Sequence, residues 1–146
     1  MQAPLRLLNA FRTSVEPGLL IATAVSTAIF MATPLVLSDV IDDFDVGATA
    51  ASLVSGVQLG GFVLATWGAG RFVSASSGVF VASCLGLAAA GLVSAIAPEF
   101  ALLLVARAVS GLALGTLTWL AWSEVFGNND KMGDVSAVGP LAGVVA

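Results

Sequence analysis

A single cation, Arg107, lies inside an apolar run that extends from Phe100 to Trp122. The run is long enough to cross a bilayer as a helix, which takes about 20 residues. A charge at that depth costs at least ~2.5 kcal/mol on insertion scales, so it normally faces a protein partner or a water-filled path. Gly111 and Gly115 follow Arg107 at four-residue steps and therefore share its helix face. The sequence predicts a membrane helix whose polar face packs closely on a neighbour, with Arg107 either tying helices together or serving function.

Composition also indicates a membrane protein. The chain is 58% hydrophobic and only 10% charged, against about 25% charged residues in soluble proteins. It has no histidine and one cysteine, Cys84, which excludes an internal disulfide and a metal site built from these ligands. The apolar runs contain no pair of carboxylates that could act as acid and base. We therefore expect no enzyme activity, no catalytic residue, no metal and no cofactor.

Four long apolar segments predict an all-α, polytopic membrane helical bundle. The expected spans are residues 18–37, 49–70, 78–97 and 100–122, preceded by a tail at 1–17 and followed by a loop at 123–134. A further apolar stretch, residues 135–146, is shorter than the roughly 17 residues that a span needs. We therefore expect it to begin a truncated fifth span, in a fragment or shortened product whose remainder follows Ala146.

Charged residues between the segments predict an orientation. The cations outside the spans, which all fall on one face of the membrane, are Arg6, Arg12, Arg71 and Lys131. The positive-inside bias makes that face cytoplasmic, so the tail and the loop at 123–134 are expected in the cytoplasm and the chain in the cell membrane. The acidic stretch 39–45 and Glu99 then lie outside. The stretch lacks the glycine and distal glutamate of a calcium-binding loop, so a solvated loop is the preferred interpretation.

Small residues mark one face of the second segment. This stripe consists of Ser52, Gly56, Gly60 and Gly68. Small residues let membrane helices approach closely, where packing and hydrogen bonds replace the missing hydrophobic drive. The stripe predicts a tightly packed bundle.

Polar residues within the spans outline a possible substrate path. The candidates are Thr27, Gln58 and Trp119. A threonine hydroxyl can equally bond a carbonyl of its own helix, which is a purely local role. The larger amide of Gln58 is the better candidate for a cavity wall or an interhelical hydrogen bond.

The stretch from Leu103 to Gly115 resembles the fourth-helix motif of the major facilitator superfamily of secondary transporters. In that motif an arginine is followed four residues later by glycine and then by more small residues, as in Arg107, Gly111 and Gly115. The short turn at 97–100 and the alternation of inner and outer loops are also similar. The resemblance implies helices one to four, and the start of five, of the N-terminal six-helix half of such a transporter. These proteins bind substrate near the midplane and alternate access by rocking their halves.

The inner loop between the second and third segments departs from the family signature, because only Arg71 matches it. The resemblance implies gating roles for Arg71, Arg107, Gly111 and Gly115. It also implies a small-molecule substrate, protons or another coupling ion, and a lipid bilayer, but no nucleic acid. The alternative hypothesis is a small membrane-embedded structural or interaction protein that oligomerises through its glycine-rich helix faces.

Overall fold

The computed structural model describes residues 17–126, whose regular elements are all helical. They are α2 (Pro17–Ala32), the 3-10 helix η1 (Thr33–Val36), α3 (Leu37–Phe44), α4 (Ala48–Phe72), α5 (Ser77–Ala95) and α6 (Phe100–Val125). The expected start of a fifth span at 135–146 lies outside the described residues, as do most of the tail and most of the loop at 123–134. Within the described part, the predicted all-α class is confirmed.

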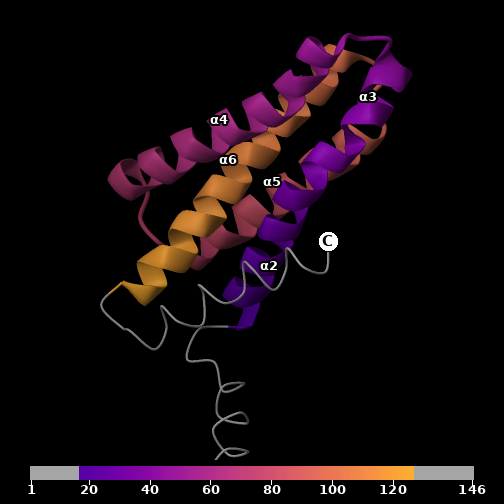
Figure 1. The fold of residues 1–146 in the computed structure, drawn as a ribbon. Helices are drawn as coiled ribbons and strands as arrows, with labels where there is room; N and C mark the ends of the chain where they lie inside the picture. Colours follow the sequence, from indigo (N-terminus) through magenta and orange to yellow (C-terminus); the bar gives the residue numbers. More distant parts are fainter. Residues whose placement is uncertain (1–16, 127–146) are drawn as a thin grey trace, which may run out of the picture.

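Helix α6 lies at the centre of the bundle (Figure 1). It makes its most extensive contact with α4, followed by α5 and then α2. Helices α4 and α6 run parallel, since Val54 packs with Leu103 near their starts and Phe62 meets Gly115 further along. We call the end where α4 and α6 finish the Arg71 end, and the end where they begin the Glu99 end. Helices α2 and α5 begin at the Arg71 end, where Gly18, Ser76 and Glu124 line one pocket.

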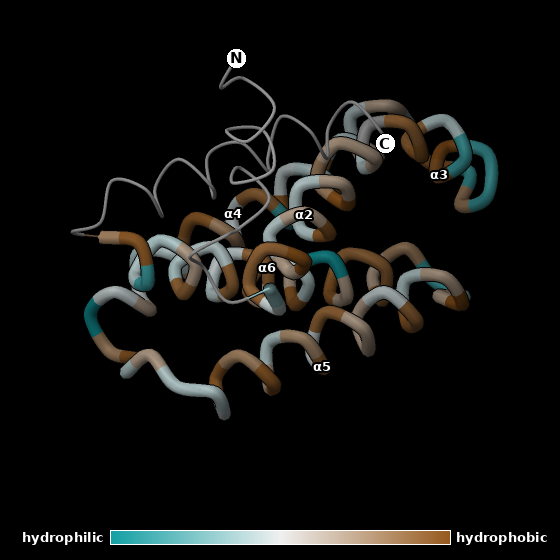
Figure 2. Tube along the Cα trace, turned by 90° about the horizontal axis from the view of Figure 1, so that it is seen from below, coloured by the Kyte–Doolittle hydropathy of each residue, from teal (hydrophilic) through white to brown (hydrophobic). Residues whose placement is uncertain are grey.

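The helices have the length and surface of membrane spans. Each of α4, α5 and α6 is long and apolar enough to cross a bilayer, and α2 with α3 would make a fourth if the bent pair is one span. Large apolar side chains point away from the bundle, including Leu92 at 71% exposure and Ile96 at 79%. In Figure 2 brown stretches alternate with pale, near-neutral ones along α2, α4, α5 and α6. An apolar surface of this extent belongs in hydrocarbon rather than in water, as in a multi-pass membrane protein.

The first expected span is broken rather than continuous. Helix α2 ends at Ala32, and after η1 the axis of α3 is bent by 59° from that of α2. Pro34 lies in this break. Proline has no backbone N–H to donate and clashes with the carbonyl one turn earlier, so it kinks or ends a helix. The hydroxyl of Thr33 bonds the carbonyl of Ile29 at 2.9 Å.

Helix α3 replaces the solvated loop that was expected at 39–45. Its apolar residues recur at helical spacing and pack on α4 and α6; they are Leu37, Val40, Ile41 and Phe44. The aspartates at 39, 42 and 43 are exposed on the opposite side. Asp45 ends the helix in the left-handed conformation, with φ 48°. The loop prediction is therefore wrong for residues 39–44, which form an amphipathic helix.

The predicted small-residue stripe of α4 is not the face that packs on α6. Cβ atoms added at Gly56, Gly60 or Gly68 would meet nothing within 4 Å among the described residues. The neighbouring Gly61 instead faces α6, where an added Cβ would lie 2.7 Å from the carbonyl oxygen of Ala108. The bundle is tightly packed as predicted, but on another face of α4.

Gly60 and Gly61 offer a matched test of this contact. We expect Gly61→Ala to lower the free energy of unfolding by about 1–3 kcal/mol, the usual cost of overpacking. Gly60→Ala should be neutral or stabilising, because alanine favours a helix by roughly 0.5–1 kcal/mol where space is open. Thermal unfolding of the purified protein in one detergent measures both. Equal effects of the two substitutions would contradict the packing of α4 on α6.

Candidate functional site

The predicted residues Gly111 and Gly115 lie where the backbones of α6 and α4 touch. A Cβ at Gly111 would collide with the carbonyl oxygen of Gln58, and one at Gly115 with that of Phe62. Both collisions are with backbone, which cannot rotate away as a side chain can. Glycine is therefore required at both positions for α4 and α6 to approach this closely.

This close approach brings Arg107 against Gln58. Arg107 lies one turn before Gly111, and the side chain of Gln58 leans toward the start of its own helix, where Arg107 is. Nη1 of Arg107 donates a long hydrogen bond to Oε1 of Gln58, at 3.5 Å. Gln58 is 1% exposed, whereas Arg107 is half-buried. Two predicted site residues, 49 positions apart in sequence, thus form one polar cluster.

Thr33 is the third member of this cluster. Its hydroxyl lies 3.2 Å from Oε1 of Gln58 and 2.9 Å from the carbonyl oxygen of Ile29. A hydroxyl carries one hydrogen, so Thr33 donates to only one of these acceptors at a time. Residues from three expected spans therefore meet at one buried amide: Thr33 from the break in the first span, Gln58 from the second and Arg107 from the fourth.

The cluster has more donors than acceptors. Nε2 of Gln58 and Nε of Arg107 are buried and have no hydrogen-bond partner among the described residues, and the same holds for Oγ of Ser55. Because a guanidinium only donates, the amide oxygen must face Arg107 and the amide NH₂ must point away. Helices α2, α4 and α5 contain no carboxylate, and Glu124 lies in the last turn of α6. Such an environment favours hydrogen-bond acceptors and anions.

Two cavities flank the cluster. Gln58, Ser55 and Thr33 line one of about 130 Å³ between α4 and the first span. Arg107, Ser94 and Ser110 line another of about 230 Å³ among α2, α5 and α6. Each cavity exceeds the ~30 Å³ that one water molecule occupies in the liquid, so either can hold water or a small ligand.

The three predicted substrate-path residues do not share one cavity. Thr27 donates to the carbonyl of Thr23 at 3.0 Å and lines another space, of about 360 Å³, with Thr118 and Trp122. This space adjoins the Gln58 cavity, with which it shares Phe30 and Leu59. The indole nitrogen of Trp119 would lie 3.4 Å from a Cβ built at Gly70, near the Arg71 end. Gln58 alone belongs to the Arg107 cluster.

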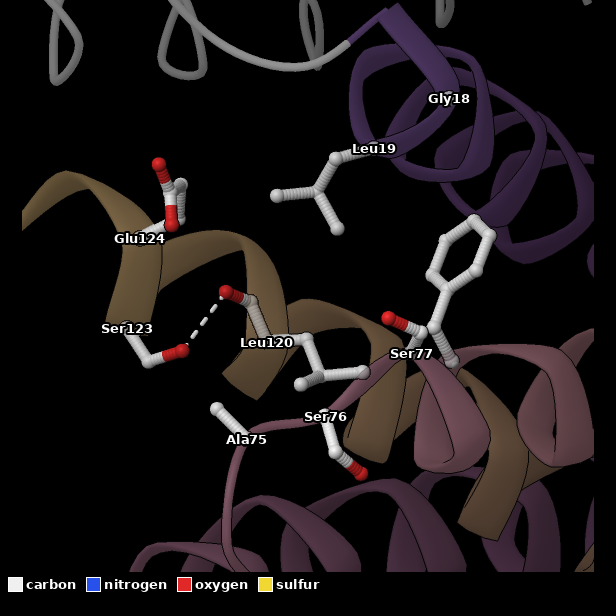
Figure 3. Close-up of a pocket in the computed structure, with 9 residues that line it drawn as sticks. Gly18, Leu19, Ala75, Ser76, Ser77, Leu120, Ser123 and Glu124 are labelled. Atoms are coloured by element: carbon white, nitrogen blue, oxygen red, sulfur yellow. Dashed lines mark hydrogen bonds between the residues drawn. The ribbon is translucent and has the colours of Figure 1, made fainter.

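Arg71 lies at the end of α4, away from Arg107. It is exposed, and its guanidinium carbon lies 4.5 Å from the ring centroid of Trp67, a cation–π arrangement. The structure therefore does not bring the two predicted cations together. At this end a pocket of about 270 Å³ opens between the start of α2, the loop before α5 and the last turns of α6, as Figure 3 shows.

Sequence reasoning missed Ser55 as a site residue. It lies one turn before Gln58, and this helical spacing is the signal that could have placed both on one face. Thr33 lies within the first expected span, at 18–37. Its position directly before Pro34 marks the break that brings it to the cluster.

Comparisons with protein-family models, with curated proteins and with solved structures found no match for this chain. Residues 17–126 contain no group of three or more His, Cys, Asp or Glu side chains that could hold a metal ion. The functional interpretation therefore depends on the polar cluster and its cavities.

Gln58 offers a direct test of the cluster. We expect Gln58→Leu to lower the free energy of unfolding by about 1–3 kcal/mol, because Arg107 loses its acceptor while remaining inside the bundle. Gln58→Glu should be at least as stable as the wild type, since a carboxylate supplies a charge-assisted hydrogen bond. Chemical unfolding in detergent at neutral pH measures both. If leucine and glutamate have the same effect, the contact with Arg107 is refuted.

Proposed function

We propose that the chain is part of a secondary transporter of the major facilitator type, which moves a small-molecule solute by alternating access. The observation that carries this proposal is Arg107, a cation within a membrane-length helix that bonds a neutral amide, has an unpartnered Nε and lines a cavity. Ionisable groups at such positions commonly mark substrate or ion pathways.

The break in the first span supplies the moving part of this proposal. The hydroxyl of Thr33 can donate to either of two acceptors. One is the carbonyl of Ile29, in the same broken span, and the other is the amide oxygen of Gln58, which also accepts from Arg107. That oxygen has two lone pairs and can accept from both donors, whereas the single hydrogen of Thr33 bonds only one of its two acceptors at a time. An exchange of Thr33 between these acceptors would move the broken segment relative to α4, a local change at a hinge of the kind that gates many sites.

We also propose that the Arg71 end faces the cytoplasm and that the protein lies in the cell membrane. Arg71 lies at that end, whereas the exposed aspartates of α3 and Glu99 lie at the other. This distribution supports the positive-inside assignment. A gradient of protons or of another ion would drive transport of the solute.

A transport assay tests the role of Arg107. Everted membrane vesicles containing the protein are offered a mixture of small metabolites, and the solutes that accumulate are identified by mass spectrometry. We expect Arg107→Ala to abolish the accumulation of at least one solute while the protein still inserts. Arg107→Lys should restore it only in part, because an ammonium cannot reproduce the planar guanidinium fork. Unchanged accumulation with the alanine variant, together with lower stability, would make Arg107 a packing residue.

Cysteine labelling tests the orientation. In a Cys84→Ser background, we expect a membrane-impermeant maleimide to modify Asp42→Cys in intact cells and to leave Ser74→Cys unmodified. Both positions are exposed, so access from outside decides the result. Permeabilised cells, in which both should react, provide the control. The reverse pattern in intact cells would invert the proposed topology.

One observation favours the alternative, a structural protein that self-associates. The stripe at Gly56, Gly60 and Gly68 is open among the described residues, and glycine faces of this kind mediate helix association in membranes. Under this alternative no solute accumulates in the vesicle assay, with or without Arg107.

A further inference from the structure

A long apolar groove runs between α2 and α5, with α6 beneath it. Its volume is about 500 Å³. One wall is the ridge Ile21, Val25 and Ile29 of α2, and the other extends along α5 from Phe80 to Gly91. At the helical rise the second wall is roughly 16 Å long.

The groove leads to Arg107. The cavity that contains Arg107 shares three lining residues with the groove, namely Ile29, Leu87 and Gly91. The apolar groove therefore ends at a cation. The neighbours of that cation in the cavity include two hydroxyl groups, those of Ser94 and Ser110.

From this continuity we propose that the protein binds a single-chain amphiphilic carboxylate, a fatty-acid anion. Its carboxylate bonds the guanidinium of Arg107, and its hydrocarbon chain lies in the groove. Arg107 has an unpartnered Nε, and no residue that lines its cavity carries a carboxylate. A carboxylate supplies the charge and the two acceptor oxygens that a guanidinium fork binds best. This assignment concerns binding and does not require translocation.

The depth of Arg107 separates this ligand from an ordinary membrane phospholipid. Arg107 lies seven residues after Phe100, roughly 10 Å inside the Glu99 end of α6. From there the groove runs to Gly18 and Phe80, where it meets the pocket shown in Figure 3 at the Arg71 end. A phospholipid keeps its headgroup at the membrane surface. The ligand proposed here has its head at depth and its chain directed toward the opposite surface.

Gly91 controls the passage between the groove and the Arg107 cavity. It lines both, and a Cβ added there would meet nothing within 4 Å. A bulky side chain at this position would therefore obstruct the passage. Gly86 on the same helix is equally open and lines neither space, so it provides a matched control.

Cys84 makes occupancy of the groove measurable. It is the single cysteine of the chain, it is half-buried, and it lines the groove. The experiment uses the purified protein in detergent depleted of fatty acids. The rate of Cys84 alkylation by N-ethylmaleimide is followed with dodecanoate, and with dodecanol as the uncharged probe of the same chain length. The thermal unfolding temperature is a second readout that does not depend on thiol reactivity.

Dodecanoate at ten times its Kd should slow alkylation roughly tenfold, as expected from site occupancy, and should raise the unfolding temperature. Dodecanol should do neither. Arg107→Gln and Gly91→Leu should abolish both effects of dodecanoate, and Gly86→Leu should preserve them. Equal effects of dodecanol and dodecanoate, or undiminished effects in Arg107→Gln, would show partitioning of hydrocarbon and overturn the proposal. Absence of both effects in the wild type would also overturn it. Because binding is measured directly, such a failure leaves the transport proposal standing.

Discussion

The backbone contact between α4 and α6 determines where the polar groups of this bundle meet. Packed helices usually lie 8–10 Å apart because side chains separate them. Here Gly61, Gly111 and Gly115 remove that separation, and each faces a backbone atom of the other helix. In a bilayer no hydrophobic force drives helices together, so close packing and hydrogen bonds must hold them. The same contact places Gln58 against Gly111 and within reach of Arg107, which lies one turn earlier on α6.

The partner of Arg107 is a neutral amide rather than a carboxylate. A carboxylate would neutralise the guanidinium and consume its donors, whereas Gln58 offers one oxygen, shared with Thr33, and leaves the positive charge in place. Uncompensated charge in a low-dielectric environment is unfavourable. The bundle thus retains an unfavourable feature that an anionic ligand relieves. On our proposal, such an arrangement contributes to ligand affinity rather than to stability.

The long apolar segments and the shared face of Arg107, Gly111 and Gly115 could be predicted from sequence, because hydropathy and helical spacing determine them. Helix α3 was missed, although Leu37, Val40, Ile41 and Phe44 follow helical spacing, because the aspartates between them indicated a loop. The glycine stripe of α4 does not face α6, and the sequence could not show this, since a glycine on an open helix face looks the same in sequence as one that faces a helix. Gly61 belongs to no stripe and could only be found once the crossing of α4 and α6 was known. For the same reason, the separation of Thr27 and Trp119 from Gln58 depended on how the helices rotate about their axes.

The most direct measurement is the proximity of Arg107 to Gln58 in a lipid bilayer. Solid-state NMR can report this proximity. The protein is labelled with ¹⁵N in the arginine side chains and with ¹³C at the glutamine carboxamide. The substitution Gln2→Asn leaves Gln58 as the only labelled glutamine of the chain. The arrangement described here, with Nη1 of Arg107 3.5 Å from Oε1 of Gln58, predicts a measurable ¹⁵N–¹³C dipolar coupling that disappears in Arg107→Ala. Protein in bilayers that shows no such coupling would contradict this arrangement, and with it the contact on which the cluster depends.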